Sequence, residues 1–231
     1  MKNIILIAFL AAAGGYWLLL SRPALYYPDS REYKCFTLRG RGELPSGTQL
    51  ALDRALASIS ASEFFSPDTK FDIYLAGGPR GLSFFAPFVA GNYSRVSPIS
   101  GGIFLAAARF DGDSILPSPE AAETRDLNKV IAAAAARKMA MDRVKPLTYI
   151  YMTDWEFAGY GEIISGGSGL FKPEDICGKE APEGSALLEY KYGLAVALVL
   201  SEEKMSFANL LDKNFSYEGA ERQLKQRYCG R

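Results

Sequence analysis

The sequence contains no histidine. Histidine is the usual general base at neutral pH and the commonest metal ligand in proteins, so its absence removes the most frequent catalytic and zinc-binding side chain. Cysteine is scarce too: Cys35, Cys177 and Cys229 lie far apart and form no CxxC pair, which excludes zinc-site spacing. In an oxidising compartment two of them could form a disulfide, with Cys177–Cys229 the favoured pair; isolated thiols are the alternative.

Net charge and long basic runs are also missing. Lys+Arg and Asp+Glu number 26 each, so the formal charge is zero. The sequence therefore lacks the excess of basic residues that is typical of nucleic-acid-binding proteins. What is present is a composition typical of a folded protein, with 48% hydrophobic and 23% charged residues over 231 positions. This length accommodates one well-buried domain after an N-terminal segment.

The N-terminal segment, "MKNIILIAFLAAAGGYWLLLSRP", is uncharged from Ile4 to Leu20. At ~1.5 Å per residue this run reaches about 25 Å, near the lower limit for a membrane-spanning helix. Tyr16 and Trp17 suit the aromatic belt of a membrane interface. We predict that residues 1–22 are an uncleaved signal anchor, because "YWLLL" continues the apolar run past the small residues "AAAGG"; a cleaved signal peptide is the alternative. The single-pass anchor would place the following domain in an extracytoplasmic, periplasmic compartment.

After the anchor we expect a linker over 23–34 and one domain over 35–231. Short apolar runs bounded by turn residues predict strands at 32–42, 70–78, 81–90 and 101–110. Helical spacing predicts helices at 48–62, 127–144, 155–165, 184–203, 206–213 and 217–228. Strands first and helices second indicate an α+β fold, with a small, mainly antiparallel sheet and a helical C-terminal half.

The central predicted helix is unusual, because it contains an unbroken alanine run from Ala132 to Ala136. Asp126 is the predicted N-cap of this helix and Pro146 its stop. The simplest interpretation is structural: alanine has the best helix propensity and lets a neighbouring element approach closely.

The surroundings of this run resemble a known family. "RDLNKVIAAAAARKMAMDRV", then "DWEFAGYGEIISG" and "LLEYKYGLAVALVLSEEKMSFANLLDK" are similar to membrane-anchored bacterial zincin-like proteins, metallopeptidases of the gluzincin type. In that family the first helix reads "VIAHExxH" and the second resembles "WxxEGYAEYIAG". "SGGIFLAAARF" resembles the family's glycine-led strand, which borders the active-site cleft. The resemblance extends from about the strand at Phe71 to Gln226 and implies a zincin-like fold.

The same resemblance assigns the site positions. Aligned on "VIA", the first histidine falls on Ala133, the general-base glutamate on Ala134 and the second histidine on Arg137, while the third ligand falls on Ala158. A one-residue shift moves the motif within Ala132 to Ala136 and also supplies no ligand. Family members bind zinc, which needs three or four N, S or O donors; none of these positions offers one. We therefore expect no cofactor and no metal here.

Three hypotheses follow. The first is a membrane-anchored pseudopeptidase that has lost hydrolysis and binds an extended peptide or protein partner in the vestigial cleft, by strand addition beside "GGIFLA". The second is a hydrolase that acts through unrecognised residues, such as the neighbouring Glu162 with Tyr160 or Tyr151. The third is a structural envelope protein. Arg137 could bind a carboxylate in the vacated cleft, from a peptide terminus or from Glu162; the alternatives are a solvated helix-surface arginine and an internal salt bridge.

Overall fold

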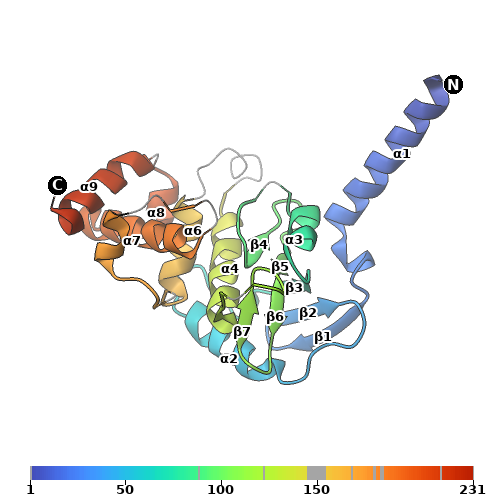
Figure 1. The fold of residues 1–231 in the computed structure, drawn as a ribbon, viewed down its shortest axis with the longest axis horizontal. Helices are drawn as coiled ribbons and strands as arrows, with labels where there is room; N and C mark the ends of the chain where they lie inside the picture. The colour runs from blue at the N-terminus through green and yellow to red at the C-terminus, as the bar shows by residue number, and fades with distance from the viewer. Residues whose placement is uncertain are drawn as a thin grey trace.

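The computed structural model describes residues 2–87, 89–121, 123–144, 155–167, 169–178, 181–182, 185–213 and 215–230. It is an α+β fold from which one long N-terminal helix, α1 (Lys2–Ser21), projects (Figure 1). The sheet lies near the base of α1 and most of the helices lie at the opposite end, where the chain ends (Figure 1).

The main sheet has five strands in the order β1-β2-β3-β5-β4. Their bounds are β1 (Asp29–Tyr33), β2 (Phe36–Gly40), β3 (Phe71–Leu75), β4 (Ser94–Val96) and β5 (Ile103–Leu105). β1–β2 and β4–β5 pair antiparallel, but β2, β3 and β5 run parallel. The prediction of a mainly antiparallel sheet is therefore wrong for this sheet. The chain between β2 and β3 contains α2 (Thr48–Ile59), and a helical crossover joins parallel strands.

A second, smaller sheet is wholly antiparallel. It contains β6 (Ala107–Arg109), β7 (Ser114–Leu116) and β8 (Arg125–Asp126) in that order. The run 101–110, predicted as one strand, thus supplies β5 to one sheet and β6 to the other. The chain leaves the first sheet at Ala106.

The remaining helices include six α-helices and two short 3-10 turns. Their bounds are η1 (Pro23–Leu25), α3 (Pro79–Phe85), α4 (Leu127–Met141), α6 (Trp155–Ile164), η2 (Pro173–Cys177), α7 (Ala186–Glu203), α8 (Phe207–Leu211) and α9 (Tyr217–Cys229). The helices predicted at 48–62, 127–144, 155–165, 184–203, 206–213 and 217–228 are confirmed, each with slightly different ends. Pro146 and Tyr151 lie outside the described residues.

The segment 81–90 is not the predicted strand, because α3 occupies its first half. Pro79 lies in the first turn, where a helix tolerates proline. Leu82 and Phe85, three positions apart, are both buried, whereas Ser83 and Phe84 between them are exposed. This is one face of a helix. A short apolar run does not distinguish the two structures by sequence.

The segment predicted as a linker, 23–34, carries structure of its own. Pro23–Leu25 forms η1 and Asp29–Tyr33 forms the edge strand β1. Between them Tyr27 is only 2% exposed and packs against Tyr74 and Phe85, with ring centroids 5.4 and 5.2 Å apart. Burial raises the pKa of Tyr27 well above its ordinary value. The chain thus joins the core almost directly after α1.

The start of α4 is held by a residue other than the predicted cap. The Asp126 side chain makes no cap hydrogen bond. Instead, the Asp113 carboxylate accepts hydrogen bonds from the backbone N–H of Asn128, at 3.1 Å, and from its side chain, at 2.7 Å. Asp113 also pairs with Arg54 of α2 at 2.8 Å. The turn before β7 therefore fixes both helices.

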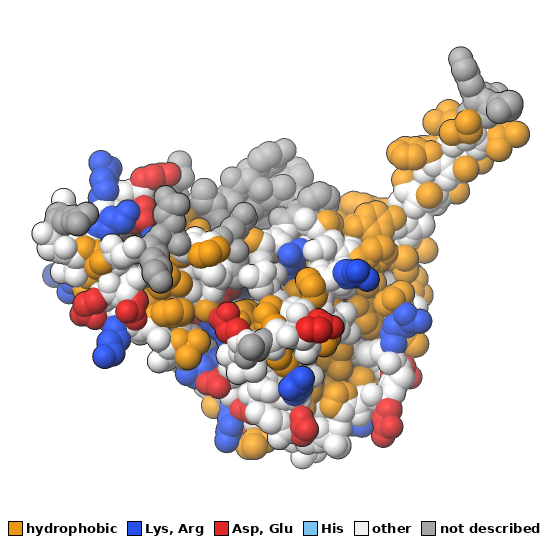
Figure 2. Space-filling view, viewed as in Figure 1, with side chains coloured by type: hydrophobic (Ala, Val, Ile, Leu, Met, Phe, Trp, Pro, Cys, Tyr) orange, Lys and Arg blue, Asp and Glu red, His pale blue; other side chains and the backbone are white. Residues whose placement is uncertain are grey.

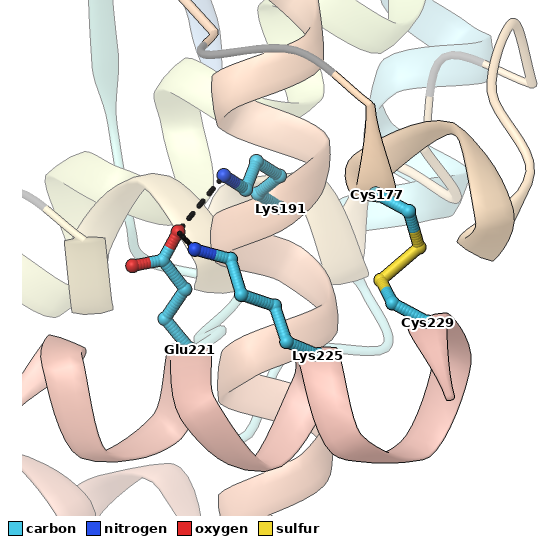
Figure 3. The surroundings of a disulfide bond; sticks show 5 residues. All are labelled: Cys177, Lys191, Glu221, Lys225 and Cys229. Carbon is cyan, nitrogen blue, oxygen red and sulfur yellow. Dashed lines mark hydrogen bonds and ion pairs between the residues drawn. A yellow bond between two sulfur atoms is a disulfide. The ribbon is translucent and has the colours of Figure 1, made fainter. Parts of the chain in front are cut away.

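The C-terminal helix is cross-linked to the body of the protein (Figure 3). A disulfide joins Cys177 of η2 to Cys229 of α9, which confirms the favoured pair, and Cys35 is a buried free thiol. Beside the disulfide, the Glu221 carboxylate lies between Lys191 and Lys225, at 3.0 and 3.1 Å (Figure 3).

Helix α1 is apolar over Ile4–Ser21, with mean hydropathy 2.1, and almost all of this stretch is exposed. Its length and composition satisfy the requirements of a membrane span and of a signal sequence alike. Hydrophobic side chains cover α1 and continue onto the part of the domain that it joins (Figure 2).

Candidate functional site

The two helices that carry the predicted site positions lie against each other. A Cβ atom added to Gly161 of α6 would lie 2.8 Å from the backbone oxygen of Ala133 in α4, and 3.2 Å from Cγ of Arg137. Only glycine permits this approach. On its other side α6 meets α7 equally closely, because a Cβ on Gly159 would lie 2.4 Å from the backbone oxygen of Tyr192. Helix α6 is thus held between α4 and α7.

The predicted positions divide into two groups. Ala133 and Ala158 are 9% and 7% exposed and stand outside the hydrophobic core, whereas Ala134 is 1% exposed and belongs to it. Arg137 and Glu162 lie one helical turn after Ala133 and Ala158. The structure therefore brings Ala133 and Arg137 to the α4–α6 contact, whereas the Glu162 side chain lies against Gly193 of α7 and Ala134 is turned into the interior.

Arg137 is part of a buried ion-pair cluster formed by four elements. Its Nη2 lies 2.9 Å from Oε1 of Glu189 in α7. The other oxygen of Glu189 accepts a hydrogen bond from Nη1 of Arg125 in β8. Nη2 of Arg125 lies 3.5 Å from Oε2 of Glu162 in α6. We call these four residues the arginine–glutamate cluster. Of the alternatives for Arg137, the structure shows the internal salt bridge.

The cluster is desolvated and its charges balance. Side-chain exposure is 6% for Arg125, 5% for Glu162, 13% for Arg137 and 16% for Glu189. Burial by itself would raise the pKa of Glu189, but Arg137 and Arg125 outweigh it and hold that pKa below its ordinary value. Glu189 is therefore ionised at neutral pH. The two guanidinium groups of Arg125 and Arg137 are matched by the two carboxylates of Glu162 and Glu189, as buried charges require.

Tyr160 does not join this cluster. Its hydroxyl lies 2.8 Å from the hydroxyl of Ser62, and its ring stacks on Phe207 with centroids 4.0 Å apart. Burial raises the pKa of Tyr160, with the Ser62 hydrogen bond opposing the shift. Glu162 faces Arg125 instead, so the described residues show no pairing of Glu162 with Tyr160, and Tyr151 lies outside them.

The donor set at the predicted metal position does not fit zinc. Ala133, Ala134 and Ala158 offer no lone pair, Arg137 is a cation, and Glu162 and Glu189 are engaged by arginines. Within the ranges that the structure describes, no three Cys, Asp or Glu side chains are grouped so that they could hold a metal ion. No catalytic step through a metal can be derived from these residues.

The glycine-led strand is placed differently from the expectation. β5 lies between β3 and β4 and pairs with both, so its backbone cannot accept an added strand. The prediction of strand addition beside "GGIFLA" is therefore wrong for β5. β4 is the edge strand on this side, and it packs against α4. The backbone N–H of Ser97 donates to Gly102 at 2.9 Å, and alternation along the strand directs the N–H of Val96 away from β5.

Sequence reasoning missed Arg125 and Glu189. Glu189 had a signal: within "ALLEYKYGLAVALVL" it is one of only two charged residues, and the other, Lys191, pairs with Glu221. A charge in an otherwise apolar helix needs a buried partner. Arg125 had no comparable signal, because its burial depends on how β8 approaches α7.

Comparison with known proteins does not extend this description: no protein-family model, no curated protein and no solved structure matches the chain.

Proposed function

We propose that this chain is a zincin-like pseudopeptidase, in which the arginine–glutamate cluster stands where the family holds its metal. The observation that carries the proposal is the contact of α4 with α6 at Ala133 and Gly161, with Arg137 in an ion pair at the second histidine position. The two arginines and two glutamates of the cluster neutralise one another without a metal. The activity that remains to the protein would be the binding of an extended peptide or protein partner.

We place the partner along the edge strand β4, which packs against α4, the helix that carries Ala133. We infer that an extended peptide pairs with the outward backbone N–H of Val96 and lies next to α4. Helix α1 would hold the domain at the membrane, with the domain on the extracytoplasmic side. A disulfide between Cys177 and Cys229 is in keeping with an oxidising compartment.

The first test concerns ancestry and uses the full chain in detergent. Wild-type protein should contain far less than one zinc per chain by elemental analysis. The combined variant Ala133→His, Ala134→Glu, Arg137→His and Ala158→Glu should bind zinc, because it restores three ligands and the general base. The matched control, Ala133→His with Ala134→Glu alone, adds one ligand and should not. Stoichiometric zinc in the wild type with chelator-sensitive proteolysis would rule the proposal out, as would a folded combined variant without zinc.

The second test concerns binding. A library of unstructured peptides is screened by fluorescence anisotropy against the wild type, and the binders are remeasured on two variants. Val96→Pro removes the outward N–H of β4 and should abolish binding, whereas Val96→Ala keeps that N–H and should retain most of it. Equal binding to both variants would place the peptide elsewhere and contradict the proposal, and so would the absence of any binder.

A further inference from the structure

A pocket of about 630 Å³ lies at the base of α1, away from the arginine–glutamate cluster. Its walls come from the chain just after α1, from the end of β2 and from α3. Tyr27, Leu44, Leu75 and Phe85 supply an apolar lining, and the charged side chains are Arg41, Arg80 and Glu43. The pocket therefore combines apolar walls with an excess of positive charge.

Helix α3 of the domain contacts the second half of α1. The Tyr16 hydroxyl donates a hydrogen bond to the backbone oxygen of Phe84 at 2.9 Å, and the two rings are 5.1 Å apart. The part of the apolar helix that is free of the domain, residues 4–15, is thus about 18 Å long at ~1.5 Å per residue. A bilayer's hydrocarbon core is about 30 Å thick. If α1 spans a membrane, the end of α3 and η1 must therefore sit in the interfacial layer.

The surface around the pocket has the composition of such a layer. Trp17, Leu25, Tyr26 and Phe84 are large hydrophobic side chains that are 61%, 61%, 38% and 42% exposed. Tryptophan and tyrosine are the residues enriched at the level of lipid headgroups. The space-filling view shows hydrophobic side chains continuing from α1 onto the domain, with Lys and Arg side chains close by (Figure 2).

The two arginines are placed to receive an anion. Arg41 is held by the Tyr26 side chain: its guanidinium lies 4.4 Å from the ring centroid and donates to the hydroxyl at 2.8 Å. Arg80 is exposed in the first turn of α3, and no other described side chain forms an ion pair or hydrogen bond with it. The planar guanidinium group of arginine forms paired hydrogen bonds with a phosphate group. A guanidinium group without a partner beside an apolar cavity therefore suits a phosphate that is attached to an acyl chain.

We propose that this pocket binds an anionic phospholipid from the membrane leaflet in which α1 ends. The headgroup phosphate is recognised by Arg41 and Arg80, and the beginning of an acyl chain lies along Leu44, Leu75 and Phe85. The inference is independent of the proposed pseudopeptidase function, since it concerns the opposite end of the sheet. It requires that α1 remains attached to the domain.

The test uses the full chain in nanodiscs of phosphatidylcholine with phosphatidylglycerol. Native mass spectrometry of the released protein measures the ratio of the two lipids that it retains. Wild type should enrich phosphatidylglycerol. Arg80→Gln should lower that enrichment about fivefold and Arg41→Gln with Arg80→Gln about thirtyfold, whereas lysine at both positions should preserve most of it. The single Arg80 variant matters because Arg41 also contacts Tyr26.

Arg222→Gln in α9 is the matched control, since it removes an exposed arginine at the other end of the molecule and should leave the lipid ratio unchanged. Three results would overturn the proposal: no enrichment in the wild type, equal enrichment in the double variant, or displacement of the lipid by inorganic phosphate, which would indicate a soluble anion. Recovery of a mature chain without residues 1–21 would overturn it too, because the pocket would then have no bilayer beside it.

Discussion

The two ends of the domain differ in how their interiors are packed around the two sites. On the sheet side, large rings stack on one another: Phe104 lies 4.8 Å from Tyr74 and 5.3 Å from Phe85, centroid to centroid. On the helical side, glycine and alanine bring α4, α6 and α7 together, and the space left between them holds the arginine–glutamate cluster.

The two kinds of packing suit different kinds of site. Stacked rings leave irregular gaps at their margin, so the sheet side accommodates an open pocket. Helices that touch through backbone atoms have no freedom to shift, so charges between them keep a fixed geometry. A site that must keep its shape belongs to the helical side, and a site that must admit a flexible ligand belongs to the sheet side.

The largest effect should come from breaking the charge balance on the helical side. Glu189→Gln keeps the side chain's shape but leaves two buried guanidinium groups facing one carboxylate, so the free energy of unfolding should fall by about 4 kcal/mol. Chemical unfolding of the full chain in detergent measures this change. Glu203→Gln, on the exposed end of the same helix, should change it by less than about 0.5 kcal/mol. Similar small values for both variants would show that the cluster is not coupled to folding.

On the sheet side the neighbours Phe84 and Phe85 give a matched pair. Phe85 is 2% exposed and stacks on Phe104, so Phe85→Ala should lower the free energy of unfolding by about 3 kcal/mol. Phe84 is 42% exposed, so Phe84→Ala should change that free energy by only about 0.5 kcal/mol. The same unfolding measurement compares them. Equal losses of unfolding free energy in the two variants would contradict the burial of Phe85 and the exposure of Phe84.

Gly159→Ala tests the close helix contact with a single methyl group. The added Cβ would lie 2.4 Å from the backbone oxygen of Tyr192, so α6 and α7 must separate, at a cost of about 2 kcal/mol despite alanine's better helix propensity. Gly178→Ala is the control, because a Cβ there meets nothing within 4 Å. A stabilised Gly159→Ala variant would mean that these helices are not in backbone contact.

Acid should lower the free energy of unfolding through the same cluster, and we expect this effect to be the smallest of the four. The folded-state pKa of Glu189 lies below its ordinary value of 4.5, so the stabilisation from its charge is complete above that pH and is lost as the pH falls through the lowered pKa. The difference in unfolding free energy between wild type and Glu189→Gln should therefore narrow as the pH falls below about 4.5. A difference that stays constant from pH 7 to pH 3 would contradict the ion pairing of Glu189.

The parts of the fold that were predictable are those with local signals. Helix α4 and the helices after it follow from their spacing, and the α+β class follows from their order. Strand direction did not, because whether β3 lies parallel to β2 depends on the path of α2 over the sheet. Helix α3 was missed because a short apolar run around Phe85 has no period long enough to read. The zincin-like identity stays a prediction.

The candidate site, like the fold, has features that the sequence predicted and features that it did not. Sequence placed Ala133, Arg137 and Ala158 on two helices and indicated that no metal donors accompany them. It gave no means of finding that Arg137 faces Glu189, since the two side chains are joined only when α4 and α7 pack on either side of α6.

By itself the sequence determined the apolar N-terminal helix, the helices of the C-terminal half and the absence of a metal-donating side chain at Ala133, Ala134, Arg137 and Ala158, because each depends on residue type and spacing along the chain. Only the tertiary structure decided which charges neutralise one another, which strand forms the sheet edge and where a pocket opens beside α1. These depend on distances between segments remote in sequence, and packing sets those distances through the backbone contacts that small residues permit.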